Sequence, residues 1–237
     1  MKKIMTRLLS LALICAFVPS FVLADTWDLE KGDITVNATD TSQTVTQVNG
    51  EAKVDASPVI TSNGTATDHT ITINAASGAK ANVTLENVNI DVSNEGKAAI
   101  TAQGSGNVNI ELNGTNTVVS GKAHAGVEKN NEGNLTIADK DNNGSLNATG
   151  GKFGAGIGGG NKGAGTDITI SGGEVSATGG ELGAGIGGGE TGAGEKITVS
   201  GGKVIAQGGK NGAGIGGGKG NFRNEGNGKD IKVIGGE

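Results

Sequence analysis

The heptapeptide GAGIGGG occurs three times in this 237-residue chain, at Gly154–Gly160, Gly183–Gly189 and Gly212–Gly218. Successive copies begin 29 residues apart. A fixed period of this length is typical of a solenoid, in which each repeat forms one coil that stacks on the next. The period therefore constrains the architecture far more than it constrains the function.

Each repeat alternates short apolar segments with paired glycines. The copy from Ile168 reads ITISGGEVSATGGELGAGIGGG, and the copy from Ile197 reads ITVSGGKVIAQGGKNGAGIGGG. Strict alternation places two apolar side chains on one face of a strand. Gly-Gly permits a bend with positive φ. We therefore expect an all-β fold, a parallel β-helix (β-solenoid) with rungs of about 29 residues, right-handed as parallel crossovers almost always are.

Two ladders of aliphatic residues extend this pattern upstream. One ladder contains Ile100, Val127, Ile157, Ile186 and Ile215. The other consists of the pairs Val83/Leu85, Val108/Ile110, Leu135/Ile137, Ile168/Ile170, Ile197/Val199 and Ile231/Val233. Stacked inside the coil, each such side chain would contribute roughly 1.5–3 kcal/mol. Disorder is the alternative for a glycine-rich chain, but periodic β-branched residues favour an ordered core.

The first 24 residues have the pattern of a cleaved secretory signal peptide. A basic start (Lys2, Lys3 and Arg7) precedes an apolar stretch, Leu8–Phe17, and small residues precede Asp25. The apolar stretch is too short to span a membrane. We therefore expect the protein to be secreted or displayed at the cell surface, without membrane insertion.

Residues 25–237 are expected to form a single β-helix domain. Residues 25–66 alternate less regularly and would form an irregular N-terminal rung that caps the coil. Residues 67–237 would contain the repeats, with loops at Asp139–Gly144 and Lys219–Gly228 and an incomplete last rung from Ile231. Because an open rung exposes strand edges, we expect it to pair with further sequence or with a partner.

Composition excludes several classes of function. Loss of the leader would remove Cys15, the only cysteine, and three basic residues, which shifts the net charge from −5 to −8. An acidic chain with few arginines is a poor partner for nucleic acid. The chain has only two histidines, His69 and His124, and they lie far apart in sequence. We therefore expect that the protein is not an enzyme. An enzyme that acts on acidic polysaccharide is the weakest alternative, because Arg223 has no obvious partner residue.

No cofactor is required by this sequence, but calcium is a candidate ligand. The segment Asp139–Gly144 supplies Asp139, Asp141, Asn142 and Asn143, which are oxygen ligands that a hard cation prefers. Asp167 and Asp230 each end a G-x-G-x-D segment, part of a calcium-binding repeat pattern. The alternative is a set of solvated turns, in which Asn and Asp are common.

Sugar binding usually relies on an exposed aromatic ring, and this chain offers three candidates beyond the leader. They are Trp27, Phe153 and Phe222, the last beside Arg223. Trp27 could instead close the apolar end of the coil. A surface rich in Thr, Asn and Ser can bind glycans, but it can equally be ordinary solvated exterior.

The repeats GAGIGGG and TISGGEVSATGG, with WDLEKGDI from Trp27 and LENVNID from Leu85, resemble repetitive secreted and surface β-solenoid proteins of gut-type bacteria. Such proteins are described as adhesin-like or carbohydrate-binding. The resemblance implies a surface solenoid with polysaccharide as ligand and, in some cases, calcium. We therefore expect a non-enzymatic, adhesin-like glycan-binding protein; the alternative is a structural spacer that holds other domains off the cell surface.

Overall fold

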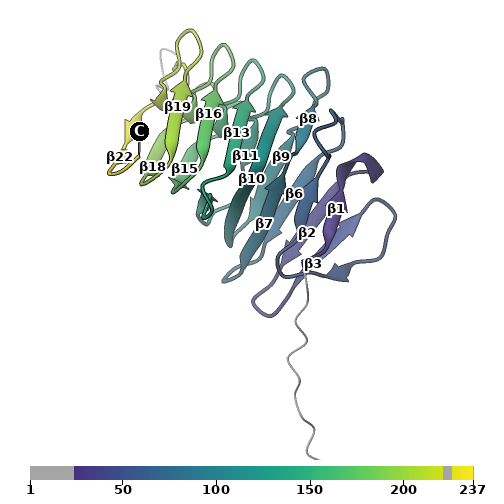
Figure 1. The fold of residues 1–237 in the computed structure, drawn as a ribbon. Helices are drawn as coiled ribbons and strands as arrows, with labels where there is room; N and C mark the ends of the chain where they lie inside the picture. Colours follow the sequence, from purple (N-terminus) through teal and green to yellow (C-terminus); the bar gives the residue numbers. More distant parts are fainter. Residues whose placement is uncertain (1–23, 221–225, 237) are drawn as a thin grey trace, which may run out of the picture.

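The computed structural model describes residues 24–220 and 226–236, which form one elongated stack of β rungs (Figure 1). It is an all-β parallel solenoid of about seven turns, with rungs of about 29 residues, as the period predicts. The first strands lie at one end of the stack and β22 lies at the other (Figure 1). Within the described ranges, no helix has the length and hydropathy to cross a bilayer.

The strands form three faces along the stack. Face 1 contains β1 (Thr26–Asp28), β5 (Val59–Thr61), β7 (Lys80–Glu86), the first half of β10 (Asn107–Val119), β12 (Leu135–Ala138), β15 (Gly165–Ile170), β18 (Gly194–Val199), β21 (Gly228–Lys229) and β22 (Lys232–Val233). Face 2 contains β8 (Asn89–Asp91), the second half of β10, β13 (Gly144–Thr149), β16 (Glu174–Thr178) and β19 (Lys203–Gln207). Face 3 contains β2 (Ile34–Ala38), β3 (Gln43–Gln47), β4 (Lys53–Val54), β6 (Ile71–Ala75), β9 (Ile100–Gly104), β11 (Val127–Lys129), β14 (Ile157–Gly158), β17 (Ile186–Gly187) and β20 (Ile215–Gly216).

Three corners connect the faces in the rungs from β12 onward, whereas β10 runs from face 1 to face 2 as one continuous strand. In the rung that begins with β12, corner 1 is Asp139–Asn143, between faces 1 and 2. Corner 2 is Gly150–Gly156, between faces 2 and 3, and corner 3 is Gly159–Ala164, which returns the chain to face 1. Equivalent corners of successive rungs lie in line, so each corner forms one edge of the solenoid.

The strand register confirms the ladder on face 3. Ile100, Val127, Ile157, Ile186 and Ile215 are direct partners in consecutive rungs, and all are buried except the half-buried Ile215. Their side chains fill the coil with those of the face 1 ladder, which gives one continuous core.

One step of the face 1 ladder differs from the prediction. The spacing pairs Val83 with Val108, but the structure pairs Val83 with Ile110 and Leu85 with Leu112. This shift of two residues leaves every side chain on its own face, so the alternating pattern cannot distinguish the two registers. From Val108 onward the predicted partners are correct.

The N-terminal end is closed by strands that break the parallel pattern. β2 pairs with β3, and β3 with β4, in antiparallel fashion, while β2 pairs with β6 in parallel. The 3₁₀ turn η1 (Leu29–Lys31) joins β1 to β2 and buries Leu29. We call residues 25–60 the cap.

Candidate functional site

The residues singled out from sequence fall on different edges of the solenoid. Asp139, Asp141, Asn142 and Asn143 lie at corner 1, and Phe153 lies at corner 2. Asp167 and Asp230 lie beside corner 3, at the start of face 1. Phe222 and Arg223, and the leader at residues 1–23, are outside the described residues. Those predicted residues that lie in the described ranges therefore do not converge on one site.

Corner 1 forms a polar groove. Its first loop, Asp139–Asn143, has five residues, whereas the next two corners, Ser171–Gly173 and Ser200–Gly202, have three each. Between the long loop and the two tight corners lies a groove of about 420 Å³. Amides of the loop, the Ser145 hydroxyl and the charged pair Glu174–Lys203 line it, with Nζ and Oε1 of that pair 2.5 Å apart.

Asp139 holds the loop of this groove in shape. Its carboxylate accepts hydrogen bonds from the backbone N–H of Gly144 at 2.9 Å and of Asn143 at 3.3 Å, and the side chain is buried. Asn142 takes a positive φ of 54°, which asparagine tolerates. Asp141, Asn142 and Asn143 are exposed on the outside of the turn. The loop therefore offers amide groups to the groove, while its buried carboxylate supports the backbone.

The two other aspartates of the calcium prediction lie on either side of a lysine. The register places Lys196 between Asp167 and Asp230, and all three residues have φ between 52° and 55°. The Lys196 ammonium lies 3.4 Å from the Asp167 carboxylate. Among the described residues, no group of three or more His, Cys, Asp or Glu side chains is placed to hold a metal ion.

Phe153 at corner 2 is half-buried and is surrounded by lysines. The ammonium of Lys122, from the preceding rung, lies 5.5 Å from the ring centroid, and that of Lys152 lies 5.6 Å from it. Lys152 also pairs with Glu181 of the next rung at 3.2 Å. The ring therefore lies close to two ammonium groups. The contact with Lys122 could not be predicted from sequence, because Lys122 is 31 positions away.

His124, in the same corner one rung earlier, contacts the buried carboxylate of Glu128. His124 Nδ1 and Glu128 Oε2 are 2.9 Å apart, and Oε2 also accepts the N–H of Ala125 at 3.1 Å. In the GAGIGGG rungs, backbone carbonyls take this role: Gly159, Gly188 and Gly217 accept from Ala155, Ala184 and Ala213. The Glu128 side chain thus accepts the hydrogen bond that a glycine carbonyl accepts in the GAGIGGG rungs.

Two further buried polar residues follow Glu128. Lys129 is 4% exposed, and its ammonium donates to the main-chain oxygen of Asn131 at 2.7 Å. Burial lowers the pKa of the Lys129 ammonium, although the nearby charge of Asp167 opposes this. Asn131 donates to the carbonyls of Gly106 and Gly133, and its Oδ1 is buried without a partner in the described part of the chain. Corner 3 is 130–134 in this rung and 159–164 in the next, so these buried residues lie where the corner lengthens.

Trp27 is a correction to the prediction of an exposed sugar platform. The side chain is only 8% exposed, and its indole N–H donates to the buried carboxylate of Asp55 at 2.9 Å. Lys53 places its ammonium 5.8 Å from the ring centroid. The ring belongs to the core of the cap, where it closes the apolar end of the coil.

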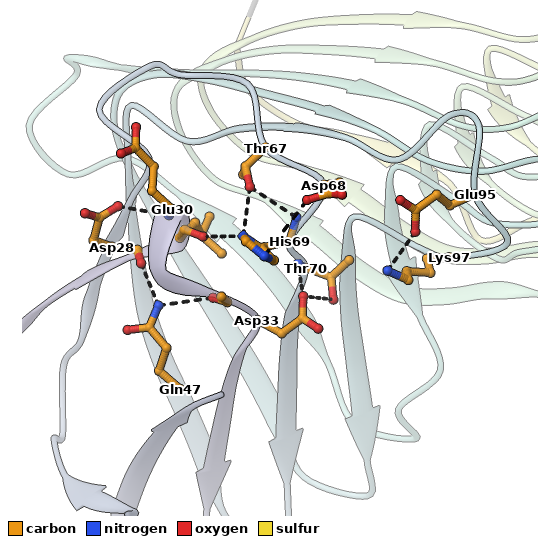
Figure 2. Close-up of polar contacts among 12 residues, drawn as sticks. Asp28, Glu30, Asp33, Gln47, Thr67, Asp68, His69, Thr70, Glu95 and Lys97 are labelled. Carbon is orange, nitrogen blue, oxygen red and sulfur yellow. Dashed lines mark hydrogen bonds and ion pairs between the residues drawn. The ribbon is translucent and has the colours of Figure 1, made fainter. Parts of the chain in front are cut away.

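His69 fastens the cap to the next rung, as Figure 2 shows. Its Nδ1 lies 2.8 Å from the carbonyl oxygen of Leu29, so it donates there and is held 3.1 Å from Thr67 Oγ1. Beside it, Asp33 accepts the N–H of Thr70 at 2.7 Å. On the same edge, the hydrogen bond to Glu95 raises the pKa of Lys97. These contacts give His69 a structural role that sequence alone does not reveal.

A family model for the Beta helix repeat matches the chain at residues 142–161, 168–190 and 197–219. All three matched segments cover face 2, corner 2 and face 3 of their rungs, and the second and third also include the end of the face 1 strand and corner 1. The match and the fold together make this a repetitive β-helix protein. Comparisons with curated proteins and with solved structures returned no match.

Proposed function

We propose that this protein is a non-enzymatic glycan-binding solenoid that is exported and displayed at a bacterial surface. The observation that carries the proposal is the corner 1 groove, where two amides, a hydroxyl and a charged pair line a space of about 420 Å³. Sugars offer many hydroxyl groups, and such polar side chains satisfy them by direct and water-mediated hydrogen bonds.

The proposal that the protein is not an enzyme is supported by the contacts that its histidines and buried carboxylates make. His124 and Glu128 serve the turn at Ala125, and His69 serves the cap. Asp139, the buried carboxylate at the groove, already accepts two backbone N–H groups. A general acid or base needs to reach a substrate proton, and these groups are engaged in the backbone instead.

The test is a pull-down against immobilised neutral and acidic polysaccharides, run with calcium and with chelator. We expect the Asn142→Gly/Asn143→Ala variant to bind at least about fivefold more weakly, since two lost hydrogen bonds are worth roughly 1–3 kcal/mol. Phe153→Ala, at a different corner, is the matched control and should bind normally. Unchanged binding by the groove variant would contradict the proposed site. Loss of glycan binding in the presence of chelator would indicate that a calcium ion bridges the glycan and the protein.

A structural spacer is the second candidate, and the separation of the candidate residues favours it. Corner 1, corner 2 and the start of face 1 each carry a few of them, and no edge gathers them all. A rigid coil needs no binding site to hold attached domains away from a cell. Absence of binding across the whole panel is the result expected for a spacer.

A further inference from the structure

Asp55, in the cap, is a fully buried carboxylate: the residue is 0% exposed. Its Oδ2 accepts the indole N–H of Trp27 at 2.9 Å and the backbone N–H of Asp25 at 3.1 Å, and its Oδ1 accepts the N–H of Ser57 at 3.1 Å. Among the described residues, no lysine, arginine or histidine side chain forms an ion pair with Asp55. A buried negative charge is costly unless a positive charge is paired with it.

The backbone of Asp25 is fixed beside this carboxylate by the strands of the cap. The carbonyl oxygen of Asp25 accepts the N–H of Val59 at 3.0 Å, and the next residue, Thr26, pairs with Val59 where β1 meets β5. These contacts involve only atoms that follow the Asp25 nitrogen in the chain. The nitrogen is therefore held 3.1 Å from Asp55 Oδ2 by contacts that do not need the residues before it.

The peptide bond between Ala24 and Asp25 is the cleavage site expected for the leader, and both residues are exposed. In the intact chain the Asp25 nitrogen is an amide, which offers one N–H and no charge. When a signal peptidase hydrolyses this bond, the water oxygen adds to the Ala24 carbonyl carbon and the C–N bond breaks. The Asp25 nitrogen leaves as an amine that takes up a proton, because the ordinary pKa of an α-amino group is about 7.7–8.0.

We propose that removal of the leader between Ala24 and Asp25 creates an α-ammonium group that pairs with the buried carboxylate of Asp55 and stabilises the cap. The pairing converts a neutral hydrogen bond into a charge-assisted one, which is roughly twice as strong. The carboxylate then has its counter-ion only in the processed chain, so removal of the leader and closure of this end of the coil are coupled. This inference rests on the export part of the proposed function and is independent of glycan binding.

Three forms of the chain test the pairing. One begins at Asp25 with a free amine, one begins at Asp25 with an acetylated amine that keeps an N–H but has no charge, and one retains Ala24. Trp27 is the only tryptophan and contacts Asp55, so a urea titration followed by its fluorescence reports unfolding of the cap. We expect the equilibrium constant for unfolding of the free-amine form to be about fivefold smaller than that of the other two, because a hydrogen bond to a charged group is roughly twice as strong as a neutral one.

The matched control is Asp55→Asn, which keeps an acceptor oxygen but removes the negative charge. In this background the three forms should unfold at the same urea concentration. Equal stability of the three forms in the parent would overturn the proposal, and so would a difference that persists in Asp55→Asn.

If Asp55→Asn does not fold, the pH dependence of the parent gives the answer. The advantage of the free form over the acetylated form should be present at about pH 6 and lost at about pH 10, where the amine is neutral. The other charged groups of the cap, including Asp28, Lys31 and Lys53, are common to both forms and cancel in the difference. An advantage that is unchanged at pH 10 would contradict the pairing.

Processing is tested separately, by expression of the whole chain in a bacterial host and N-terminal sequencing of the exported protein. The first residue should be Asp25. Any other first residue would overturn the inference, and retention of the leader would overturn the export part of the proposed function as well. Failure to bind glycans, with Asp25 as the first residue and the expected stability difference, would count against the proposed function alone.

Discussion

At the scale of single residues, glycines at equivalent positions of successive rungs determine how closely the rungs approach each other. Gly187 has a φ of +131°, and a Cβ at this position would lie 1.9 Å from the carbonyl oxygen of Gly216 in the next rung. We expect Gly187→Ala to destabilise the fold by about 3 kcal/mol or more, because the backbone of the next rung must move and a residue with a side chain is strained at this φ. Gly96→Ala, where a Cβ meets open space, should change the urea midpoint little. Equal midpoints for the two variants would contradict the steric account.

Lys129 gives a pH-dependent prediction. Burial lowers its pKa in the folded state, so between that lowered pKa and the ordinary value of 10.5 the unfolded chain binds more protons. Across this window, the free energy of unfolding contributed by Lys129 rises with pH. Urea denaturation of the parent and of Lys129→Met should therefore show that the parent gains stability relative to the variant as the pH approaches 10.5.

Lys80→Met, which alters an exposed lysine, is the control for this comparison. Its stability difference from the parent should stay constant over the same pH range. If Lys129→Met behaved like Lys80→Met, the ammonium of Lys129 would have to be solvated in the folded protein.

At the scale of elements, the cap is predicted to open independently of the central rungs. Gln47 donates to the carbonyl oxygens of Asp28 and Gly32, and His69 donates to that of Leu29. The double variant Gln47→Ala/His69→Ala removes these side-chain donors, each worth about 0.5–1.5 kcal/mol. Because solenoid rungs contact mainly their neighbours, hydrogen exchange should accelerate in β1 and η1 but not in β15–β18. Uniform acceleration along the chain would contradict this independence.

The strands of the repeats could be predicted from sequence, whereas several features of the corners and the cap could not. Alternating apolar residues placed Ile168 and Ile170 inside, as observed. Alternation is the same in parallel and antiparallel strands, so the antiparallel pairs of the cap were not predicted.

The candidate site was less predictable still, because its contacts join residues from different rungs. The groove needs the long loop at Asp139 to lie beside Glu174 and Lys203, which only the register establishes. Burial of Glu128 and Lys129 could not be foreseen either, since charged residues are seldom buried without a partner. Glu128 accepts from the His124 and Asn130 side chains and from the N–H of Ala125, and Lys129 donates to the carbonyl oxygen of Asn131; the two backbone partners carry no sequence signal.

At the scale of the whole molecule, a rung behaves as a removable unit. Deletion of residues 158–186 joins Ile157 to Gly187 and removes one full repeat, so β12 would meet β18 with the same alternation. We expect this variant to fold and unfold cooperatively at a lower urea midpoint, since stability in a solenoid is a sum over rungs and their interfaces. Deletion of residues 158–172, about half a rung, should abolish the cooperative transition. Loss of folding in both would show that the repeats are not interchangeable.

The acidic cap has a consequence for a single molecule. Residues 25–60 carry seven acidic and two basic side chains, so negative charge is concentrated at one end of the described stack (Figure 1). In the field of a charged surface, a rod with its charge distributed unevenly experiences a torque, which turns the acidic cap toward the positive side. The direction of the long axis is then set by electrostatics before any specific contact forms, while rotation about that axis stays free.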